Sequence, residues 1–347
     1  EHDIQISNNQ FLIKIVNFDF PNKQIFLEQL LNIIAKEDSQ FNFEELIQLF
    51  EFVISPNTRI INGAIYTPNN IRSFIIQSLL QRTDIDSLLP TYKIADLSCG
   101  CGAFLIDVAK TIKQYTNQSY YEIFQNHIYG IDIENYAIER SKILLILLAI
   151  TNGEDTNFEF NLLVNNSLTF KWDQYIPNFK GFDLIVGNPP YVTTKHMSDE
   201  TRQQLANMQT CQIGNPDLYI PFFEIGLENL AENGHLGFIT MNSFFKSLNA
   251  RNLRQYFQKK SVIFKIIDFG AEQIFQSRNT YTCICLISNT NSLNIQYTRA
   301  SPAELFTKQL NFQTIPYSIL HHYHGWNLHA NSIISAIENT GLPLGKK

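Results

Sequence analysis

The sequence predicts an α/β protein in which an N-terminal helical segment precedes a mostly parallel sheet with a final antiparallel strand. Strand-like and helix-like runs alternate from residue 92 onward, as in a parallel sheet that helices cover on both faces. The last two strand-like runs have no full crossover helix between them, so one of them is expected to run antiparallel. Before residue 60, apolar residues recur at three- and four-residue spacing, which indicates amphipathic helices.

The expected elements begin with helices at residues 26–37 and 43–54. Thr67 and Pro68 start another helix, because proline is favoured in the first helical turn and an apolar face continues to Leu79. Further along, we expect strands at 92–97, 127–133, 158–164, 182–187, 235–241, 262–269 and 281–288, with helices at 102–115, 137–150, 216–234 and 251–258.

This pattern divides the chain into a helical segment at residues 1–60, a central α/β domain at 61–290 and a linker at 291–347. The alternation of strands and helices stops at about residue 290. Beyond that point we expect a short strand at 293–298 and helices at 302–309 and 332–338. Ser301 is placed to cap the first of these two helices.

The composition is that of a globular protein, with 44% hydrophobic and 17% charged residues among 347. The net charge of −6 lacks the basic excess of a protein that holds nucleic acid by itself, so an enzyme without a nucleic-acid partner is the alternative to exclude. The five cysteines are an odd number and neither C-x-C pair has zinc-site spacing. We therefore expect a cytoplasmic protein with free thiols and no metal site. The longest apolar run, residues 143–150, is too short to span a bilayer.

A glycine-containing loop, DLSCGCGAF from Asp96 to Phe104, lies where the first strand of the sheet turns into its helix. Gly100 and Gly102 permit a tight turn and let a ligand approach the backbone closely. The helix that follows points its free amide N–H groups at the same space. Tight turns use glycine without any ligand as well, so the loop indicates a cofactor only in combination with other residues.

An acidic residue, Asp132, ends the second strand in the run Gly130-Ile-Asp, beside the glycine loop. Its carboxylate can accept both hydroxyl hydrogens of a ribose, although an aspartate at this position is also an ordinary helix cap. No G-x-G-x-x-G motif is present, which argues against a dinucleotide.

The tetrapeptide Asn188-Pro-Pro-Tyr191 follows the fourth strand, at the sheet edge where open α/β sheets bind ligands. The two prolines fix the backbone and cannot continue the strand. The Asn188 amide oxygen and the Pro189 carbonyl can then both accept hydrogens from one NH2 group, while Tyr191 offers a flat face to a ring. The exocyclic amine of adenine is a poor nucleophile, because its lone pair is delocalised, and two acceptors on its hydrogens favour the reactive pyramidal form.

With these motifs the chain resembles the gamma class of adenine-N6 DNA methyltransferases of restriction-modification systems. In that class the cofactor motifs precede Asn-Pro-Pro-Tyr and target recognition comes last. The match covers about residues 60–290 and implies a Rossmann-like S-adenosylmethionine-dependent methyltransferase fold with its catalytic methyltransferase domain at 61–290. The segment 291–347 is then expected to lead toward a target-recognition domain, and a chain without an initial Met is expected to be a piece of a longer protein.

The resemblance assigns individual residues to the site. It implies that Thr67-Pro68 contacts the methionine part of S-adenosylmethionine, that Asp132 binds the ribose, and that Asn166 stands where the family usually has an Asp for the cofactor's adenine. The full cofactor set is Tyr66, Thr67, Pro68, Asp96, Ser98, Cys99, Gly100, Gly102, Phe104, Asp132, Ile133, Asn166, Ser167 and Asn188. The catalytic set is Asn188, Pro189, Pro190, Tyr191 and Phe275. Phe275 is the candidate for a second aromatic that sandwiches the target base, and its alternative role is a core phenylalanine.

The function that the resemblance implies is site-specific DNA methylation. An adenine flips out of the duplex and receives the methyl group of S-adenosylmethionine, with S-adenosylhomocysteine as the product. Double-stranded DNA is the expected partner, together with a target-recognition domain or subunit and a cognate nuclease, and no membrane. Two alternatives stay open. Methyltransferases of RNA or of protein glutamine share the tetrapeptide, and a catalytically idle modification subunit would only bind a partner.

Overall fold

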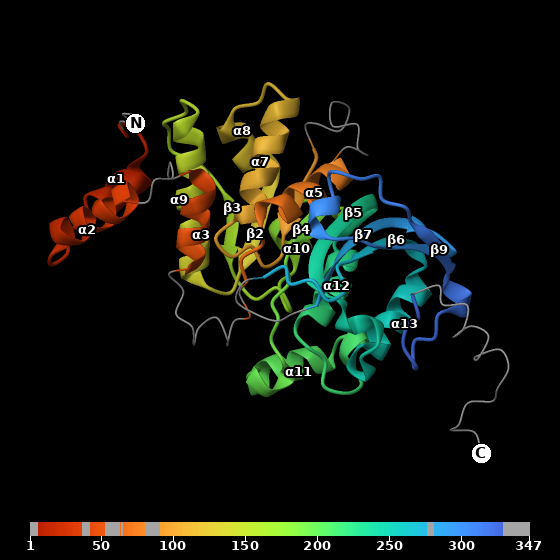
Figure 1. Ribbon diagram of the computed structural model, residues 1–347. Helices are drawn as coiled ribbons and strands as arrows, with labels where there is room; N and C mark the ends of the chain where they lie inside the picture. The colour runs from red at the N-terminus through yellow and green to blue at the C-terminus, as the bar shows by residue number, and fades with distance from the viewer. Residues whose placement is uncertain are drawn as a thin grey trace, which may run out of the picture.

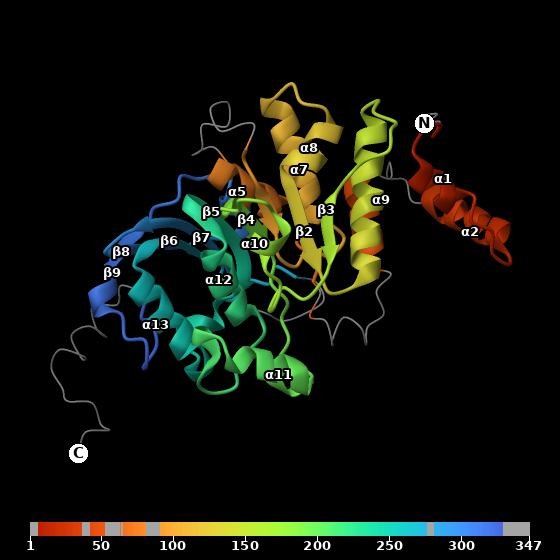
Figure 2. The ribbon, with the colours of Figure 1, turned by 180° about the vertical axis from the view of Figure 1, so that it is seen from behind.

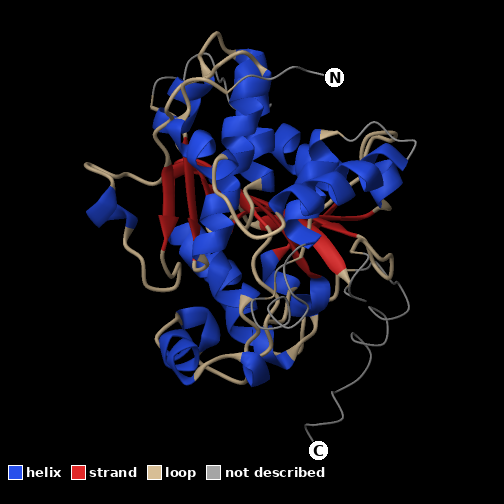
Figure 3. Ribbon diagram, turned by 90° about the vertical axis from the view of Figure 1, so that its left-hand side faces the viewer, coloured by secondary structure: helices blue, strands red, loops and turns tan. Residues whose placement is uncertain are grey.

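The computed structural model describes residues 6–36, 42–52, 63, 65–80, 91–275 and 281–328. Within them the chain forms a nine-stranded sheet with the order β3-β2-β1-β4-β5-β7-β6-β8-β9. Figure 1 shows this sheet through the centre of the molecule, and Figure 3 shows helices on both of its faces. The predicted α/β fold with a mostly parallel sheet is therefore confirmed. No helix in the described part of the chain is long and apolar enough to cross a membrane.

One half of the sheet is parallel and consists of β1 (Ile94–Asp96), β2 (Ile128–Asp132), β3 (Asn161–Val164), β4 (Phe182–Gly187) and β5 (Leu230–Met241). In the other half, β7 (Thr282–Asn291) runs antiparallel between β5 and β6 (Val262–Asp268), and is the reversed strand that the sequence predicts. Two further strands, β8 (Asn294–Arg299) and β9 (Gln313–Pro316), extend the sheet beyond β6.

The described residues form the seven α-helices that the periodicity of apolar residues predicts and four short ones that it does not, Gln10–Val16, Tyr120–Asn126, Trp172–Tyr175 and Asp199–Ala206. They are α1 (Gln10–Val16), α2 (Lys23–Lys36), α3 (Phe43–Phe52), α5 (Asn69–Leu80), α7 (Ala103–Tyr115), α8 (Tyr120–Asn126), α9 (Asn135–Thr151), α10 (Trp172–Tyr175), α11 (Asp199–Ala206), α12 (Tyr219–Glu228) and α13 (Arg251–Lys260). The short α8 is fixed by a capping box in which Ser119 and Glu122 accept from each other's backbone N–H groups. The helices α5, α7 and α9 bury their apolar residues against the sheet.

Most of the phenylalanines belong to the core, as their number in the sequence suggests. Phe257 packs against Phe223 and Trp326, with ring centroids 5.2 and 6.0 Å apart. Trp326 is completely buried, although it comes long after the last predicted strand of the sheet. The C-terminal part of the described chain is therefore built into the same hydrophobic core.

Three details differ from the predicted elements. The helix expected at 216–234 ends at Glu228, and β5 begins at Leu230, which pairs with Phe182 of β4 before the pairing resumes at His235. The predicted boundary at residue 290 lies inside β7, and residues 291–328 continue the sheet and the core where a linker was expected. The helix expected at 302–309 is only a 3-10 turn at Pro302–Glu304, although Ser301 caps it with Glu304 as a capping box. The helix expected at 332–338 lies outside the described residues.

The N-terminal segment is helical in its described parts, as predicted, but its helices differ in how they meet the body. Helices α1 and α2 project away from the sheet in both Figure 1 and Figure 2. The start of α1 is tied to the turn after α9, because Asp155 accepts from the backbone N–H groups of Ser7 and Asn8 at 2.6 and 2.8 Å. Helix α3 instead lies beside α9, with Ile47 fully buried in the main core.

Candidate active site

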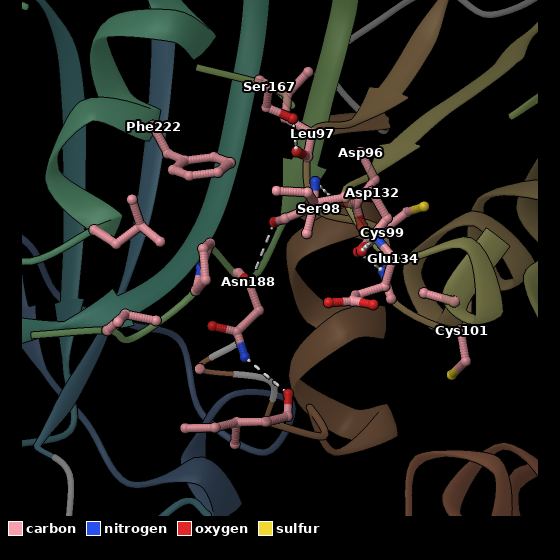
Figure 4. A pocket seen from close by; sticks show the side chains of 18 of the residues that line it. Asp96, Leu97, Ser98, Cys99, Cys101, Asp132, Glu134, Ser167, Asn188 and Phe222 are labelled. Atoms are coloured by element: carbon pink, nitrogen blue, oxygen red, sulfur yellow. Dashed lines mark hydrogen bonds between the residues drawn. The ribbon is translucent and has the colours of Figure 1, made fainter. Parts of the chain in front are cut away.

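A cavity of about 320 Å³ opens at the carboxyl ends of β1, β2 and β4. Parallel strands end at a common edge of the sheet, so Asp96, Asp132 and the tetrapeptide after Gly187 are brought together there. Gly100 and Asn188 both line this cavity, which Figure 4 shows from close by. The turn formed by the tetrapeptide Asn188–Tyr191 therefore adjoins the glycine loop, as the positions of the two motifs in the sequence predict.

The glycine loop requires two left-handed backbone positions. Gly100 has φ +53° and Gly102 has φ +83°, a region that side chains other than glycine's rarely adopt. The Ser141 hydroxyl on α9 donates to the Gly100 carbonyl at 2.8 Å. A Cβ on Gly102 would lie 2.9 Å from the Oγ of Ser141. The two glycines thus let the loop pack against α9 and leave the start of α7 facing the cavity.

Two carboxylates lie beside this loop, those of the buried Asp96 and the half-buried Asp132. Asp132 accepts from the backbone N–H groups of Gly100 at 2.9 Å and Glu134 at 3.0 Å, and burial raises its pKa to about 6. Asp96 accepts from the Ser98 N–H at 3.0 Å, and burial raises its pKa to about 7, with the Asp132 charge adding to the increase. The protein thus holds negative charge in a desolvated place, which favours a ligand that brings hydroxyl donors or positive charge.

The side chain of Asn188 is oriented by the motif upstream of the sheet. Its amide NH2 donates to the Ile65 carbonyl at 3.2 Å and to the Thr67 hydroxyl at 3.0 Å. This fixes the amide oxygen beside the cavity, where it is buried and accepts no hydrogen bond from the described residues. Burying an acceptor without a hydrogen bond is unfavourable in free energy. A ligand that donates a hydrogen bond to this oxygen would therefore be stabilised.

The rest of the tetrapeptide divides between the cavity and the core. Pro190 lines the cavity, whereas Pro189 and Tyr191 are buried and do not contribute to its lining. Tyr191 is 4% exposed, and its hydroxyl donates to the Ile239 carbonyl on β5 at 3.3 Å. Tyr191 thus lies on the far side of the corner from the glycine loop.

Phe275 lies next to Tyr191, as the sandwich hypothesis requires, but no slot separates the two rings. Their centroids are 6.1 Å apart and their planes are inclined at 58°. A base stacked on both faces needs parallel rings separated by about 7 Å, twice a carbon contact distance. Phe275 is 2% exposed in this state and packs as a core residue. Its role at a target base stays a prediction.

Of the predicted cofactor residues, Pro68 and Gly102 do not line the cavity, because Pro68 leads into α5 and Gly102 faces α9. The cavity is lined by Tyr66, Thr67, Asp96, Ser98, Cys99, Gly100, Phe104, Asp132, Ile133, Asn166, Ser167 and Asn188. Asn166 already uses its amide within the protein: the oxygen accepts from the Leu168 N–H and the NH2 donates to Gln204, both at 3.0 Å. Its assignment to the cofactor's adenine also stays a prediction.

Several residues that line the cavity are not among the predicted site residues, and three of them bear on its chemistry. Phe222, from α12, projects toward the cavity near Ser167, as Figure 4 shows. Phe222 lies one turn after the start of α12, and an aromatic residue at that position is the feature of the sequence that could have indicated it. Glu134 comes two residues after Asp132, at the N-cap of α9. Glu51 comes from α3, and no local pattern connects it with the glycine loop.

The cysteines and histidines do not add a second reactive centre. All five cysteines are buried and free. Burial and the nearby carboxylates raise the thiol pKa values of Cys99 and Cys101 well above the usual range, so neither is a nucleophile at neutral pH. Among the described residues, no group of three His, Cys, Asp or Glu side chains is arranged to hold a metal ion.

Comparison with known families points to restriction-modification enzymes. Residues 126–275, which include Asp132 and the tetrapeptide, match the family model described as Eco57I restriction-modification methylase. The chain is 28% identical over 276 residues to the type II restriction enzyme and methyltransferase RM.Eco57I of Escherichia coli, covering 65% of this chain and 27% of that protein. It is 26% identical to the type II methyltransferase M.BstVI of Geobacillus stearothermophilus, covering 72% of this chain and 46% of that protein. The chain thus spans less than half of the length of these two relatives.

Solved structures show the same fold. DrdV, in a complex with DNA, superposes with a TM-score of 0.68 at 14% identity, covering 93% of this chain and 38% of DrdV. A class I S-adenosylmethionine-dependent methyltransferase described as putative, from Listeria monocytogenes, superposes with a TM-score of 0.57 at 16% identity, covering 84% of this chain and 82% of that one. The predicted resemblance to restriction-modification DNA methyltransferases and the predicted Rossmann-like methyltransferase fold are both confirmed.

Proposed function

We propose that this chain, as a relative of restriction-modification methylases, binds S-adenosylmethionine and methylates the N6 amine of an adenine in DNA. The observation that carries the proposal is the Asn188 amide oxygen, which is buried, accepts no hydrogen bond from the part of the chain that the structure describes, and adjoins a cavity lined by the glycine loop. The matched family and the named relatives support DNA as the substrate. The choice of adenine rests on the resemblance of Asn188–Tyr191 to the adenine-N6 class, because other bases also carry an exocyclic amine that this oxygen could accept.

The cavity suits the cofactor in size and chemistry. Its volume of about 320 Å³ is that of a small-molecule site. Asp132 is placed to accept the ribose hydroxyl hydrogens of the cofactor. The ring of Phe222, which lines the same cavity as Asn166 and Ser167, can cover one face of the cofactor's adenine. Asp96, Asp132 and Glu134 give this wall the negative charge that suits a cationic ligand. S-adenosylmethionine, when bound, supplies an electrophilic methyl group on a sulfonium centre.

The reaction needs the protein mainly to bind and orient the amine. The Asn188 oxygen accepts one N–H of the base and, as the sequence of the tetrapeptide predicts, the Pro189 carbonyl accepts the other. These bonds localise the nitrogen lone pair and point it at the methyl group. A nitrogen–carbon bond forms as the sulfur–carbon bond breaks, the released proton passes to solvent, and S-adenosylhomocysteine remains. No side chain needs to form a covalent bond with the substrate.

The target adenine reaches Asn188 and Pro189 by base flipping. The target nucleotide must leave the duplex, because the Asn188 oxygen is buried. Tyr191 and Phe275 are the candidate stacking partners, and their rings must separate to admit a base. The net charge of −6 supports the view that a target-recognition domain or subunit supplies much of the contact with the DNA backbone.

A parallel methyl-transfer assay tests the substrate. The protein is incubated with S-adenosylmethionine carrying a labelled methyl group and with duplex DNA, RNA or a protein mixture, and N6-methyladenine is identified in digested DNA. Label in DNA as N6-methyladenine supports the proposal. Label in RNA or on glutamine would assign the same corner to another amide or amine. Binding of the cofactor without transfer to any substrate, also in the presence of a related recognition subunit, would indicate an idle modification subunit.

A further inference from the structure

The wall of the cavity next to the glycine loop includes a helix from the N-terminal segment. The Glu44 carboxylate of α3 forms an ion pair with the completely buried Arg72 of α5, 2.8 Å from its Nη2. Glu44 also accepts from the Tyr66 hydroxyl, and Gln48 donates to that hydroxyl at 3.2 Å. Burial and this carboxylate raise the pKa of Tyr66 to about 12, which keeps the hydroxyl protonated as a donor. Helix α3 is thus anchored to the Tyr66-Thr67 motif.

The same face of α3 carries Glu51 to the cavity. Glu51 lies seven residues after Glu44, two helical turns along, and lines the cavity. Its Oε1 accepts from the Cys101 N–H at 3.4 Å and would be 3.3 Å from a Cβ on Gly100. The end of the helix is held from the other side, where Arg140 of α9 donates to the Phe50 carbonyl at 2.9 Å. The position of the Glu51 carboxylate is therefore fixed by contacts on both sides.

If S-adenosylmethionine binds here, as the proposed function requires, one part of the molecule must lie against the wall that contains Glu51. The adenosine is directed to Asp132 and Phe222, and the methyl group must face Asn188. The remaining part is the amino-acid tail, which leaves the sulfur in a third direction. Between the Thr67 motif and the glycine loop, the cavity is bounded by Tyr66, Cys101 and Glu51.

We propose that Glu51 binds the α-ammonium group of the cofactor's amino-acid tail, so that the N-terminal segment completes the cofactor site. Glu51 lines the cavity, and a carboxylate accepts strong, charge-assisted hydrogen bonds from an ammonium group. The described lining residues comprise the carboxylates Glu51, Asp96, Asp132 and Glu134 but only one lysine or arginine, Arg140. The charge of the wall therefore suits an ammonium group.

Calorimetric titration of three ligands tests the assignment. S-adenosylmethionine and S-adenosylhomocysteine both carry the ammonium tail, whereas 5′-methylthioadenosine lacks it. The Glu51→Gln variant should bind both tailed ligands about tenfold more weakly, the effect of one charge-assisted hydrogen bond, and bind methylthioadenosine as the unsubstituted protein does. The matched control is Glu139→Gln: Glu139 is a nearby exposed carboxylate on α9 that does not line the cavity. This control should bind all three ligands unchanged.

The outcomes separate this inference from the proposed function. If the unsubstituted protein binds none of the three ligands, the proposed function fails. If it binds them and Glu51→Gln binds the tailed ligands within twofold of it, the assignment of Glu51 is overturned. Equal weakening of methylthioadenosine would show that Glu51 only supports the loop, and weakening of S-adenosylmethionine alone would place the carboxylate at the sulfonium; either result overturns the assignment.

Hydrogen exchange gives a second measurement that needs no variant. In the unsubstituted protein, S-adenosylhomocysteine should slow amide exchange in residues 43–52 because it ties α3 to the cofactor, whereas methylthioadenosine at equal saturation should not. Equal protection of α3 by the two ligands would contradict a contact between Glu51 and the tail. This comparison stays decisive if Glu51→Gln fails to fold.

Discussion

The two ends of the candidate active site differ in how ready they are for a ligand. At the cofactor end, the glycine loop and Asp132 are fixed by hydrogen bonds around a cavity of about 320 Å³. At the base end, Tyr191 and Phe275 pack against each other and are 4% and 2% exposed. The difference follows from chemistry: polar groups keep an open site in shape through their partners, whereas two apolar rings close on each other unless a base separates them.

This contrast predicts an order of events. The cofactor enters a preformed pocket, and the target base enters only after Tyr191 and Phe275 have separated. Substitutions at the cofactor end should therefore change cofactor binding directly. Substitutions at the base end should change turnover and DNA dependence while the affinity for the cofactor stays the same. Variants at each end test this separation, and Asn188 lies between the two ends.

The largest effect is expected for Asn188→Ala. Loss of its oxygen removes an acceptor that acts on the amine during transfer, so turnover should fall by at least about 10²-fold. The affinity for S-adenosylhomocysteine should stay within about twofold, because Asp132 and the glycine loop are unchanged. Single-turnover methyl transfer and calorimetry measure the two quantities. Wild-type turnover in this variant would refute the proposed chemistry.

The sequence predicts the cofactor end better than the base end, and for a physical reason. Asp96 and Asp132 end strands, Gly100 and Asn188 come shortly after strands, and parallel strands bring their carboxyl ends together without any further information. Phe222 and Glu51 reach the cavity from helices whose position depends on tertiary packing, such as the Glu44–Arg72 ion pair, so their local sequence carries little signal.

The same reasoning explains two misplaced boundaries. Residues 291–328 contain few apolar runs, yet β8 pairs with β6 and Trp326 fills the core, because the exposed edge of β6 offers unpaired backbone groups that a later segment can satisfy. Likewise β5 begins at Leu230, inside a run that suits a helix, since pairing with Phe182 on β4 takes precedence over local propensity. Such pairings depend on the neighbouring strand and not on the local pattern.

The second prediction asks whether Phe275 is a stacking residue or only a core residue. Phe275→Leu retains apolar volume but loses the aromatic face, whereas Phe275→Tyr retains the face and adds a hydroxyl. A stacking role predicts that turnover on DNA falls about tenfold in the Leu variant and stays near normal in the Tyr variant. Cofactor affinity should be unchanged in both.

A purely structural Phe275 predicts the reverse pattern. The Leu variant would then keep its turnover, and the Tyr variant would be the less stable protein because it buries a new hydroxyl. Chemical denaturation of both variants, measured alongside their turnover, distinguishes the two patterns. Loss of cofactor affinity in the Leu variant would instead show that the two ends of the site are coupled.

A smaller effect is expected at Gly102, for which the chain offers a matched control. Gly102 and Gly153 both have left-handed backbones, with φ +83° and +85°, so alanine at either should cost about 1 kcal/mol of unfolding free energy. Nothing lies within 4 Å of a Cβ on Gly153, whereas a Cβ on Gly102 meets the Ser141 hydroxyl that holds the glycine loop. Gly102→Ala should therefore also weaken cofactor binding several-fold, and Gly153→Ala should not. Equal binding by the two variants would mean that the loop is not part of the cofactor site.

The smallest expected effect is a dependence of cofactor affinity on pH. Burial raises the pKa of Asp96 to about 7 and that of Asp132 to about 6, so both carboxyls are partly protonated below pH 7. Because their folded pKa values exceed the unfolded ones, the free protein loses stability as the pH rises from about 4 to 7. A cation favours the ionised forms, so the affinity for S-adenosylmethionine should rise several-fold between pH 5.5 and 8. S-adenosylhomocysteine lacks the sulfonium charge and should show a shallower rise. If affinity rises equally with pH for the two ligands, the sulfonium lies away from Asp96 and Asp132. These carboxylates would then act only on the ribose and the amino-acid tail.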